Sequence, residues 1–160
     1  MPEKRKRKML KVHLNNSYKE MRKNILSEIL RATDSHCNSE EIEKLLNHKY
    51  FEETFDNKKW DVFYNAINRD NHYIEDILNE FELFNRELDT VILLCPLKEN
   101  AYNTFKNVQD CIFTLQKLDY KTYEDNIKPF CRTLSEIFEH FDFANGYHDN
   151  DPIQDRIDAL

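Results

Sequence analysis

The most regular pattern in the chain runs through residues 60–95, which read WDVFYNAINRDNHYIEDILNEFELFNRELDTVILLC. Nonpolar side chains recur there at every seventh position: Trp60, Ile67, Ile74, Phe81, Leu88 and Cys95. An interleaved series comprises Phe63 or Tyr64, Asn71, Leu78, Asn85 and Ile92. Two such series at heptad spacing are typical of helices that pack along one seam. The segment is therefore predicted to be helical.

Two interpretations of this segment stay open. In the first, it forms one very long helix over about residues 57–94, which Pro96 ends because proline cannot continue the hydrogen-bond ladder. In the second, the helix breaks at residues 68–71, whose sequence NRDN is also typical of a turn.

The same kind of spacing predicts four further helices. They cover about residues 17–32, 38–55, 100–118 and a last segment from residue 122. The first two begin with Ser or Asn followed three residues later by Glu, which is a helix-capping signature. Pro129 lies inside the last pattern and is expected to kink that helix or to shift its start.

The scarcity of glycine supports an all-helical fold. The chain of 160 residues has one glycine, Gly146, although tight hairpin turns and phosphate-binding loops depend on this residue. We therefore expect an all-α, antiparallel bundle of about five helices over residues 15–143. A basic N-terminal arm over residues 1–14 and an acidic C-terminal tail over residues 144–160 complete the predicted organisation.

Charge is distributed unevenly along the chain. The net charge is −7, yet cations dominate the N-terminus, at Lys4, Arg5, Lys6, Arg7, Lys8 and Lys11. The acidic remainder disfavours nucleic-acid binding by the folded body, because it repels phosphate. The basic segment is predicted either to be solvated or to contact an anionic partner, such as nucleic acid, anionic lipid or the acidic body itself.

Membrane and secretory signals are not evident. No stretch has the roughly 18–20 apolar residues that span a bilayer, and the basic start lacks an apolar core of the signal-peptide kind. We therefore expect a cytoplasmic protein. In that setting the four widely spaced cysteines are expected to be free thiols.

Most common catalytic motifs are excluded. Phosphate-binding loops, dinucleotide fingerprints and the serine-hydrolase elbow each need at least two glycines. The Glu-x-x-His pairs of carboxylate-bridged metal sites do not occur, so we expect no metal and no cofactor.

One enzyme class survives these exclusions. Arg31 is followed by His36, a spacing that resembles the Arg–His pair of small helical ribonucleases of the HEPN type. Such a resemblance implies that the arginine holds phosphate while the histidine transfers a proton. Arg7 and His13 have a similar spacing, and Ala32 departs from the polar residue that usually follows the arginine. A helical ribonuclease or toxin-type enzyme is therefore the alternative function.

The preferred function is non-enzymatic. Asn71 and Asn85 fall within the predicted seam, where a buried asparagine commonly sets register or oligomeric state. Trp60 belongs to an aromatic cluster that suits either an interface anchor or core packing. We therefore expect an interaction or regulatory protein that uses helix-face contacts with a protein partner or with a second copy.

Overall fold

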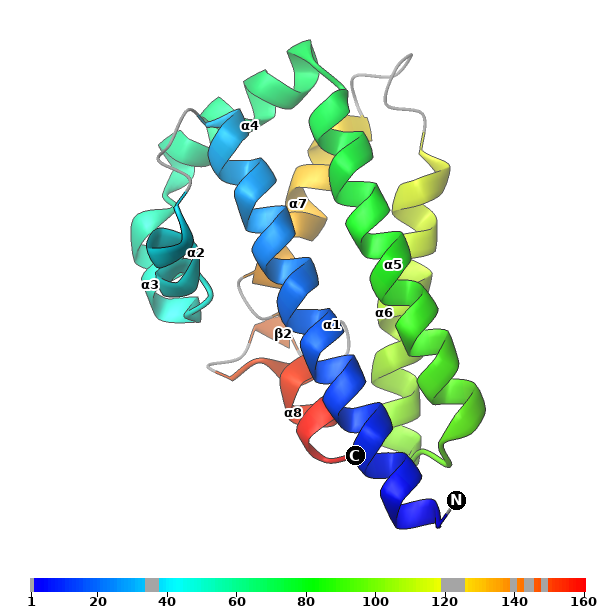
Figure 1. Ribbon diagram of the computed structural model, residues 1–160. Coiled ribbons are helices and arrows are strands. Elements are labelled where there is room, and N and C mark those ends of the chain that lie inside the picture. The colour runs from blue at the N-terminus through cyan, green and yellow to red at the C-terminus, as the bar shows by residue number, and fades with distance from the viewer. Residues whose placement is uncertain (1, 34–37, 119–125, 139–140, 143–145, 148–149) are drawn as a thin grey trace.

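The structure is a bundle of helices (Figure 1). The computed structural model describes residues 2–33, 38–118, 126–138, 141–142, 146–147 and 150–160. The helices of this part of the chain are α1 (Glu3–Ala32), α2 (Ser39–Leu45), α3 (His48–Thr54), α4 (Asn57–Arg69), α5 (His72–Leu94), α6 (Glu99–Lys117), α7 (Ile127–Phe138) and α8 (Pro152–Asp158). The all-α bundle is confirmed, but these residues form eight helices instead of about five.

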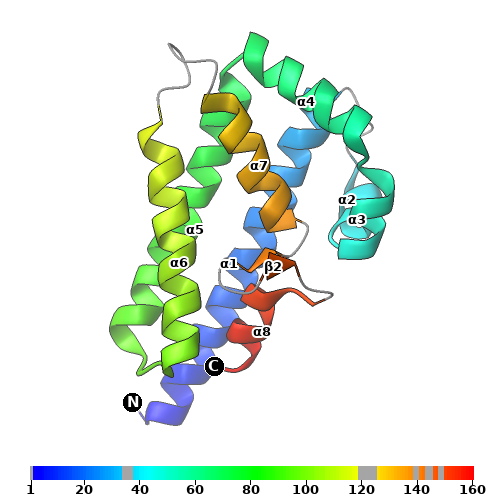
Figure 2. The same cartoon turned by 180° about the vertical axis from the view of Figure 1, so that it is seen from behind.

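The two longest helices, α1 and α5, lie side by side and antiparallel (Figures 1 and 2). Three contacts along their length establish this register. Asn24 donates to Glu80 over 3.1 Å, His13 lies 2.6 Å from Glu87, and Arg7 donates to the carbonyl of Pro96 over 3.0 Å. Helix α6 packs on α5, while α7 covers the other side of the bundle and contacts α4 (Figure 2).

The heptad series of the sequence lies in the core even though the helix is broken. Ile67, Ile74, Phe81 and Leu88 are each at most 1% exposed. Helix α4 nevertheless ends at Arg69, Asp70 is extended, and α5 begins at His72. The prediction of a single helix over residues 57–94 is therefore wrong, and the alternative, a turn in the NRDN segment, is confirmed. The break lets α4 turn away across the end of the bundle to pack on α7 (Figure 1).

Two other helix boundaries differ from those expected. The helix predicted from Ser17 begins at Glu3, because Leu10 and Leu14 extend its core-facing stripe toward the N-terminus. The basic residues near the N-terminus thus belong to α1. The helix predicted over residues 38–55 is divided at Asn47, whose side chain accepts a hydrogen bond from the backbone of Tyr50 and starts α3.

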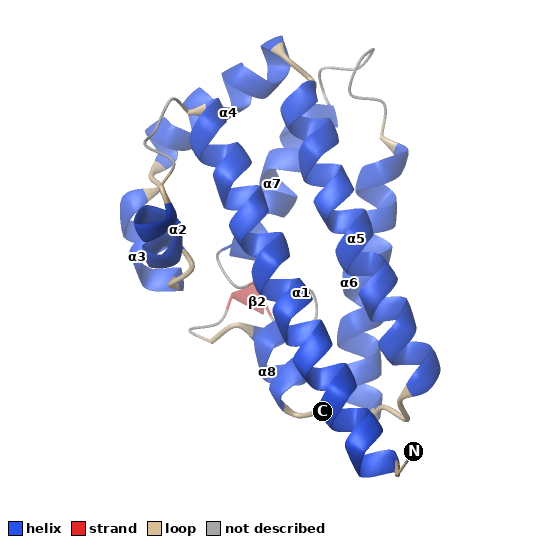
Figure 3. Ribbon diagram, in the orientation of Figure 1, coloured by secondary structure: helices blue, strands red, loops and turns tan. Residues whose placement is uncertain are grey.

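The C-terminal part of the chain also contributes to the core. Pro129 lies in the first turn of α7, where a missing backbone donor is tolerated, so the proline shifts the helix start as one of the two expected outcomes. At the junction of the predicted bundle and the predicted acidic tail, β1 (Phe141–Asp142) and β2 (Gly146–Tyr147) form a short antiparallel ribbon (Figure 3). Helix α8 follows and buries Ile153 and Ile157 against α1 and α6.

The helix ends explain how the chain manages with one glycine. Side-chain oxygens of Asn38, Asn47, Asp56 and Asp151 accept backbone hydrogen bonds at the starts of α2, α3, α4 and α8. At the other ends, the residues that follow α1 to α6 all have negative φ, between −67° and −141°. None of these positions adopts the left-handed conformation for which glycine is favoured.

A buried polar cluster joins α8 to α1. The hydroxyl of Tyr18 donates to Asp151 Oδ2 over 2.8 Å, and Arg22 Nη1 lies 3.6 Å from the same oxygen. Arg22 also donates to the carbonyl oxygen of Leu46 over 2.9 Å, which ties the end of α2 to the cluster. Because Asp151 caps α8 as well, one carboxylate positions three segments of the chain.

We predict that Asp151→Ala lowers the free energy of unfolding by about 2–4 kcal/mol, measured by urea denaturation. The substitution removes a helix cap, breaks a buried hydrogen bond and leaves the Arg22 charge unpaired with Asp151. Asp56→Ala is the matched control, because exposed Asp56 caps α4 alone, and it should cost about 1 kcal/mol. Equal losses in the two variants would contradict the linking role of Asp151.

We also predict a loss of stability at high pH that depends on Tyr18. Burial, reinforced by the negative charge of Asp151, raises the pKa of Tyr18 well above its ordinary value of 10.0. The unfolded chain therefore releases this proton first, and stability falls as the pH rises above about 10. Urea midpoints between pH 8 and pH 11 should decline less steeply in Tyr18→Phe than in the wild type. Tyr102→Phe, which changes a tyrosine that is 44% exposed, should retain the wild-type slope.

Candidate functional site

The basic residues near the N-terminus lie on the first turns of α1 and have two different environments. Arg7 and Lys11 are held by the rest of the molecule: Arg7 pairs with Glu3 and the carbonyl of Pro96, and Lys11 donates to the carbonyl of Asp158. Lys4, Arg5 and Lys8 are exposed. Lys6 is half-buried. The structure thus separates cations that anchor the helix from cations that face solvent.

Large apolar side chains are exposed beside these cations. Met9 is 55% exposed and Val12 is 53% exposed, and both line a hollow of about 680 Å³ together with Arg5 and Lys8. Because α5 runs antiparallel to α1, its last turn reaches the same end of the bundle, where Leu93 and Leu94 are 82% and 46% exposed. We call the surface lined by Arg5, Lys8, Met9 and Val12 the basal face.

The basal face arises because α1 has apolar side chains both on its core-facing side and on its exposed side. Leu10 and Leu14 continue the core stripe of α1, whereas Met9 and Val12 lie next to this stripe on the helix and are exposed. Single exposed apolar residues are ordinary, but several of them beside a row of cations mark a candidate interaction site. The sequence carried this signal, since the first fourteen residues already contain Met9, Leu10, Val12 and Leu14 among the lysines and arginines.

Trp60 lies in the aromatic core, which is one of the two arrangements expected for it. It is half-buried, and its ring centroid lies 4.8 Å from that of Phe55 and 5.8 Å from that of Phe63, both in edge-on geometry. Phe51 completes the group at 6.2 Å. Most of the contact area of Trp60 is thus engaged within the bundle.

The two seam asparagines lie apart from each other. Asn71 is in the turn between α4 and α5, directly before the first residue of α5. Asn85 lies within α5, where its backbone carbonyl accepts a 3.5 Å hydrogen bond from Gln109 of α6. Gln109 also donates to Asp89 over 2.7 Å. Asn85 is therefore near the α5–α6 contact, and the broken helix places Asn71 outside any continuous seam.

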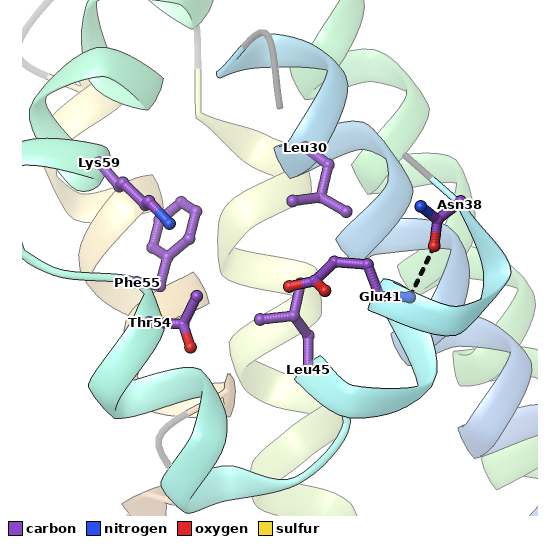
Figure 4. A pocket seen from close by; sticks show the side chains of 7 residues that line it. All are labelled: Leu30, Asn38, Glu41, Leu45, Thr54, Phe55 and Lys59. Carbon is purple, nitrogen blue, oxygen red and sulfur yellow. Dashed lines mark hydrogen bonds between the residues drawn. The ribbon is translucent and has the colours of Figure 1, made fainter. Parts of the chain in front are cut away.

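A pocket of about 520 Å³ opens where α1, α2 and α4 approach one another (Figure 4). Leu30, Leu45 and Phe55 supply its apolar surface, while Glu41 reaches toward it from α2 and Lys59 from α4. Asn38 and Thr54 also line it, and Asn38 accepts the 2.8 Å hydrogen bond from the Glu41 backbone that caps α2. The residues that line this pocket supply one carboxylate and one ammonium group, with no histidine or thiol among those described.

Arg31, the arginine of the candidate ribonuclease pair, has an acidic neighbourhood. Arg31 Nη1 lies 2.9 Å from Glu28 Oε1, and Asp76 and Glu80 line the same hollow. His36 lies outside the described residues, as does Cys37. Three carboxylates in the same hollow as Arg31 are unfavourable for RNA phosphate.

The second Arg–His pair of the sequence, Arg7 and His13, makes contacts with different residues. Arg7 donates to the carbonyl of Pro96, and His13 pairs with Glu87 at another position along α1.

The Cys131 thiol lacks the low pKa of a reactive cysteine. Burial raises its pKa to about 12, so this cysteine stays protonated at neutral pH.

A cluster that the sequence analysis missed lies between α1 and α5. Glu28, His72 and Asp76 each bring one candidate metal-ligand atom within 4.8 Å of the other two. Burial raises the pKa of Glu28, and the hydrogen bond that the His72 ring donates to Asp70 raises the pKa of His72. The i, i+4 spacing of His72 and Asp76 was a signal within the sequence, but only the antiparallel packing of α1 and α5 adds Glu28.

None of the described helices is both long enough and apolar enough to cross a membrane. We compared the chain with protein-family models, with curated proteins and with solved structures, and none of the three comparisons finds a match.

Proposed function

We propose that the protein is a non-enzymatic interaction protein and that the basal face binds its partner. The observation that carries this proposal is the exposure of Met9 and Val12, each more than half accessible, in the same hollow as the exposed cations Arg5 and Lys8. Covering apolar side chains of this size is favourable by about 25 cal/mol per Å² of apolar surface. A surface of this kind gains from a partner that supplies apolar contacts in its centre and anions at its edge.

The chemistry of the surface favours an acidic, amphipathic protein segment as partner. Cations along one helix attract carboxylates, while the apolar positions at residues 9 and 12 favour a partner helix with its own apolar stripe. The acidic character of the rest of this chain makes a second copy one form that such a partner can take. Self-association would then use the same surface and respond to the same substitutions.

The rigid placement of α1 adds to this argument. Arg7 and Lys11 attach the first turns to the α5–α6 connection and to α8, so the exposed side chains are held on an ordered helix. A pre-ordered surface loses less conformational entropy on binding than a disordered arm does.

We predict that an acidic amphipathic peptide, with leucine along one face and glutamate along the other, binds the protein with micromolar affinity. Met9→Ser combined with Val12→Ser should weaken binding at least about tenfold, because the apolar contact is lost. Arg5→Glu combined with Lys8→Glu should have a similar effect and should reduce the salt dependence. Fluorescence anisotropy at two salt concentrations measures both effects.

The matched control is Phe113→Ser, because Phe113 on α6 is 55% exposed, as Met9 is. This variant should bind the peptide as the wild type does. Sedimentation velocity on the same variants tests self-association through the basal face. Equal binding of a peptide with lysine in place of glutamate, or unchanged binding by both double variants, would refute the proposal.

A further prediction concerns the ribonuclease alternative. Since Arg31 shares a hollow with three carboxylates, we expect single-stranded RNA to remain intact with the wild type and equally with Arg31→Ala and His36→Ala. Gel analysis of labelled RNA measures this. Cleavage by the wild type that both variants abolish would establish the alternative instead.

A further inference from the structure

We propose that Glu28, His72 and Asp76 bind a divalent first-row transition-metal ion, such as Zn²⁺, between α1 and α5. The three side chains come from two helices that run antiparallel, and one candidate ligand atom of each lies within 4.8 Å of the others. The site lies toward the opposite end of α1 from the basal face, so it is independent of the proposed partner surface.

The donor set suits such an ion. Imidazole nitrogen and carboxylate oxygen are both zinc ligands, and the imidazole favours transition metals over Mg²⁺ or Ca²⁺. Bonds of about 2 Å in tetrahedral geometry separate ligand atoms by about 3.3 Å, so the separations need to close by at most about 1.5 Å. His72 and Asp76 are both exposed, which leaves their side chains room for this adjustment. Water would complete the coordination.

Glu28 provides an independent indication that something binds here. The residue is only 8% exposed, although carboxylates are rarely buried without compensation. One of its oxygens pairs with Arg31, but the other, Oε2, is buried and has no hydrogen-bond partner among the described residues. A buried oxygen without a partner costs free energy that a bound cation would offset. Glu28 also lines a hollow of about 380 Å³ together with Asp76.

His72 is already oriented as metal-binding histidines commonly are. Its Nδ1 lies 2.8 Å from Asp70 Oδ1, and the same carboxylate oxygen accepts the His72 backbone N–H over 3.1 Å. An imidazole that donates one N–H to a carboxylate presents the lone pair of its other nitrogen, here Nε2, to a metal. Asp70 thus acts as a positioning residue.

The local charge favours a cation. Glu28, Asp76 and Glu80 face the hollow, and Arg31 is the cation that lines it. Asp70 adds a further negative charge behind His72. An added divalent ion reduces repulsion among these carboxylates, while Arg31 competes with it for Glu28. Bound metal would connect the last turns of α1 to the first turn of α5.

Titration calorimetry with Zn²⁺ at pH 7.5 tests the proposal, using the full-length chain. We expect one ion per chain and a rise in Tm when the site is saturated. His72→Gln, Asp76→Asn and Glu28→Gln should each weaken Zn²⁺ binding at least about tenfold. Because His72 and Asp76 are exposed, their variants report on the site even where Glu28→Gln fails to fold. Arg31→Met should tighten binding, since it removes the competing cation.

Two controls separate this site from other ligands of the chain. His13→Gln alters a histidine that also pairs with a carboxylate, Glu87, but lies elsewhere on α1. Cys37→Ser removes a thiol next to His36 in the sequence. Both should bind Zn²⁺ within about twofold of the wild type. The absence of stoichiometric binding, loss of binding only in the controls, or equal affinity for Mg²⁺ would overturn the proposal.

Discussion

The packing of α1 against α5 is the interaction on which the rest of the structure depends. Tyr18, Ile25 and Ile29 on one helix and Phe81 and Leu88 on the other are almost completely buried, so the pair supplies the centre of the hydrophobic core. Burial of this kind is the main favourable term in folding, and its magnitude grows with the apolar area removed from water. The antiparallel register of this pair also places the ends of both helices, and therefore both candidate sites.

The chain reaches this packing with a single glycine, the residue that adopts positive φ most readily. Asparagine and aspartate caps begin four of the helices, and the residues that follow α1 to α6 keep negative φ. Asp151 combines capping with a tertiary contact, because its carboxylate caps α8 and also accepts a hydrogen bond from the Tyr18 hydroxyl. Capping by short polar side chains thus provides both helix boundaries and tertiary contacts in this molecule.

The two ends of α1 differ in chemistry, and each end carries one of the two proposed binding sites. Cations and exposed apolar side chains occupy its first turns, whereas a buried carboxylate faces acidic residues of α5 near its last turns. The first arrangement suits an anionic protein surface, and the second suits a metal cation. Both ends are connected by one rigid helix, but neither proposal requires the other.

Periodicity, together with the scarcity of glycine, determined the all-helical class. Periodicity also determined the core series from Ile67 to Leu88 and the limits of α6, because a helix of 3.6 residues per turn must place its apolar side chains on one face. The basal face could be predicted only in part. Its cations and Met9 are visible in the sequence, but which cations face solvent depends on contacts with Pro96 and Asp158. Tertiary structure decided the break at Asp70, the extension of α1 and the meeting of Glu28 with His72 and Asp76. These features depend on which distant segments pack together, and local spacing carries no information about partners more than forty residues away in the chain.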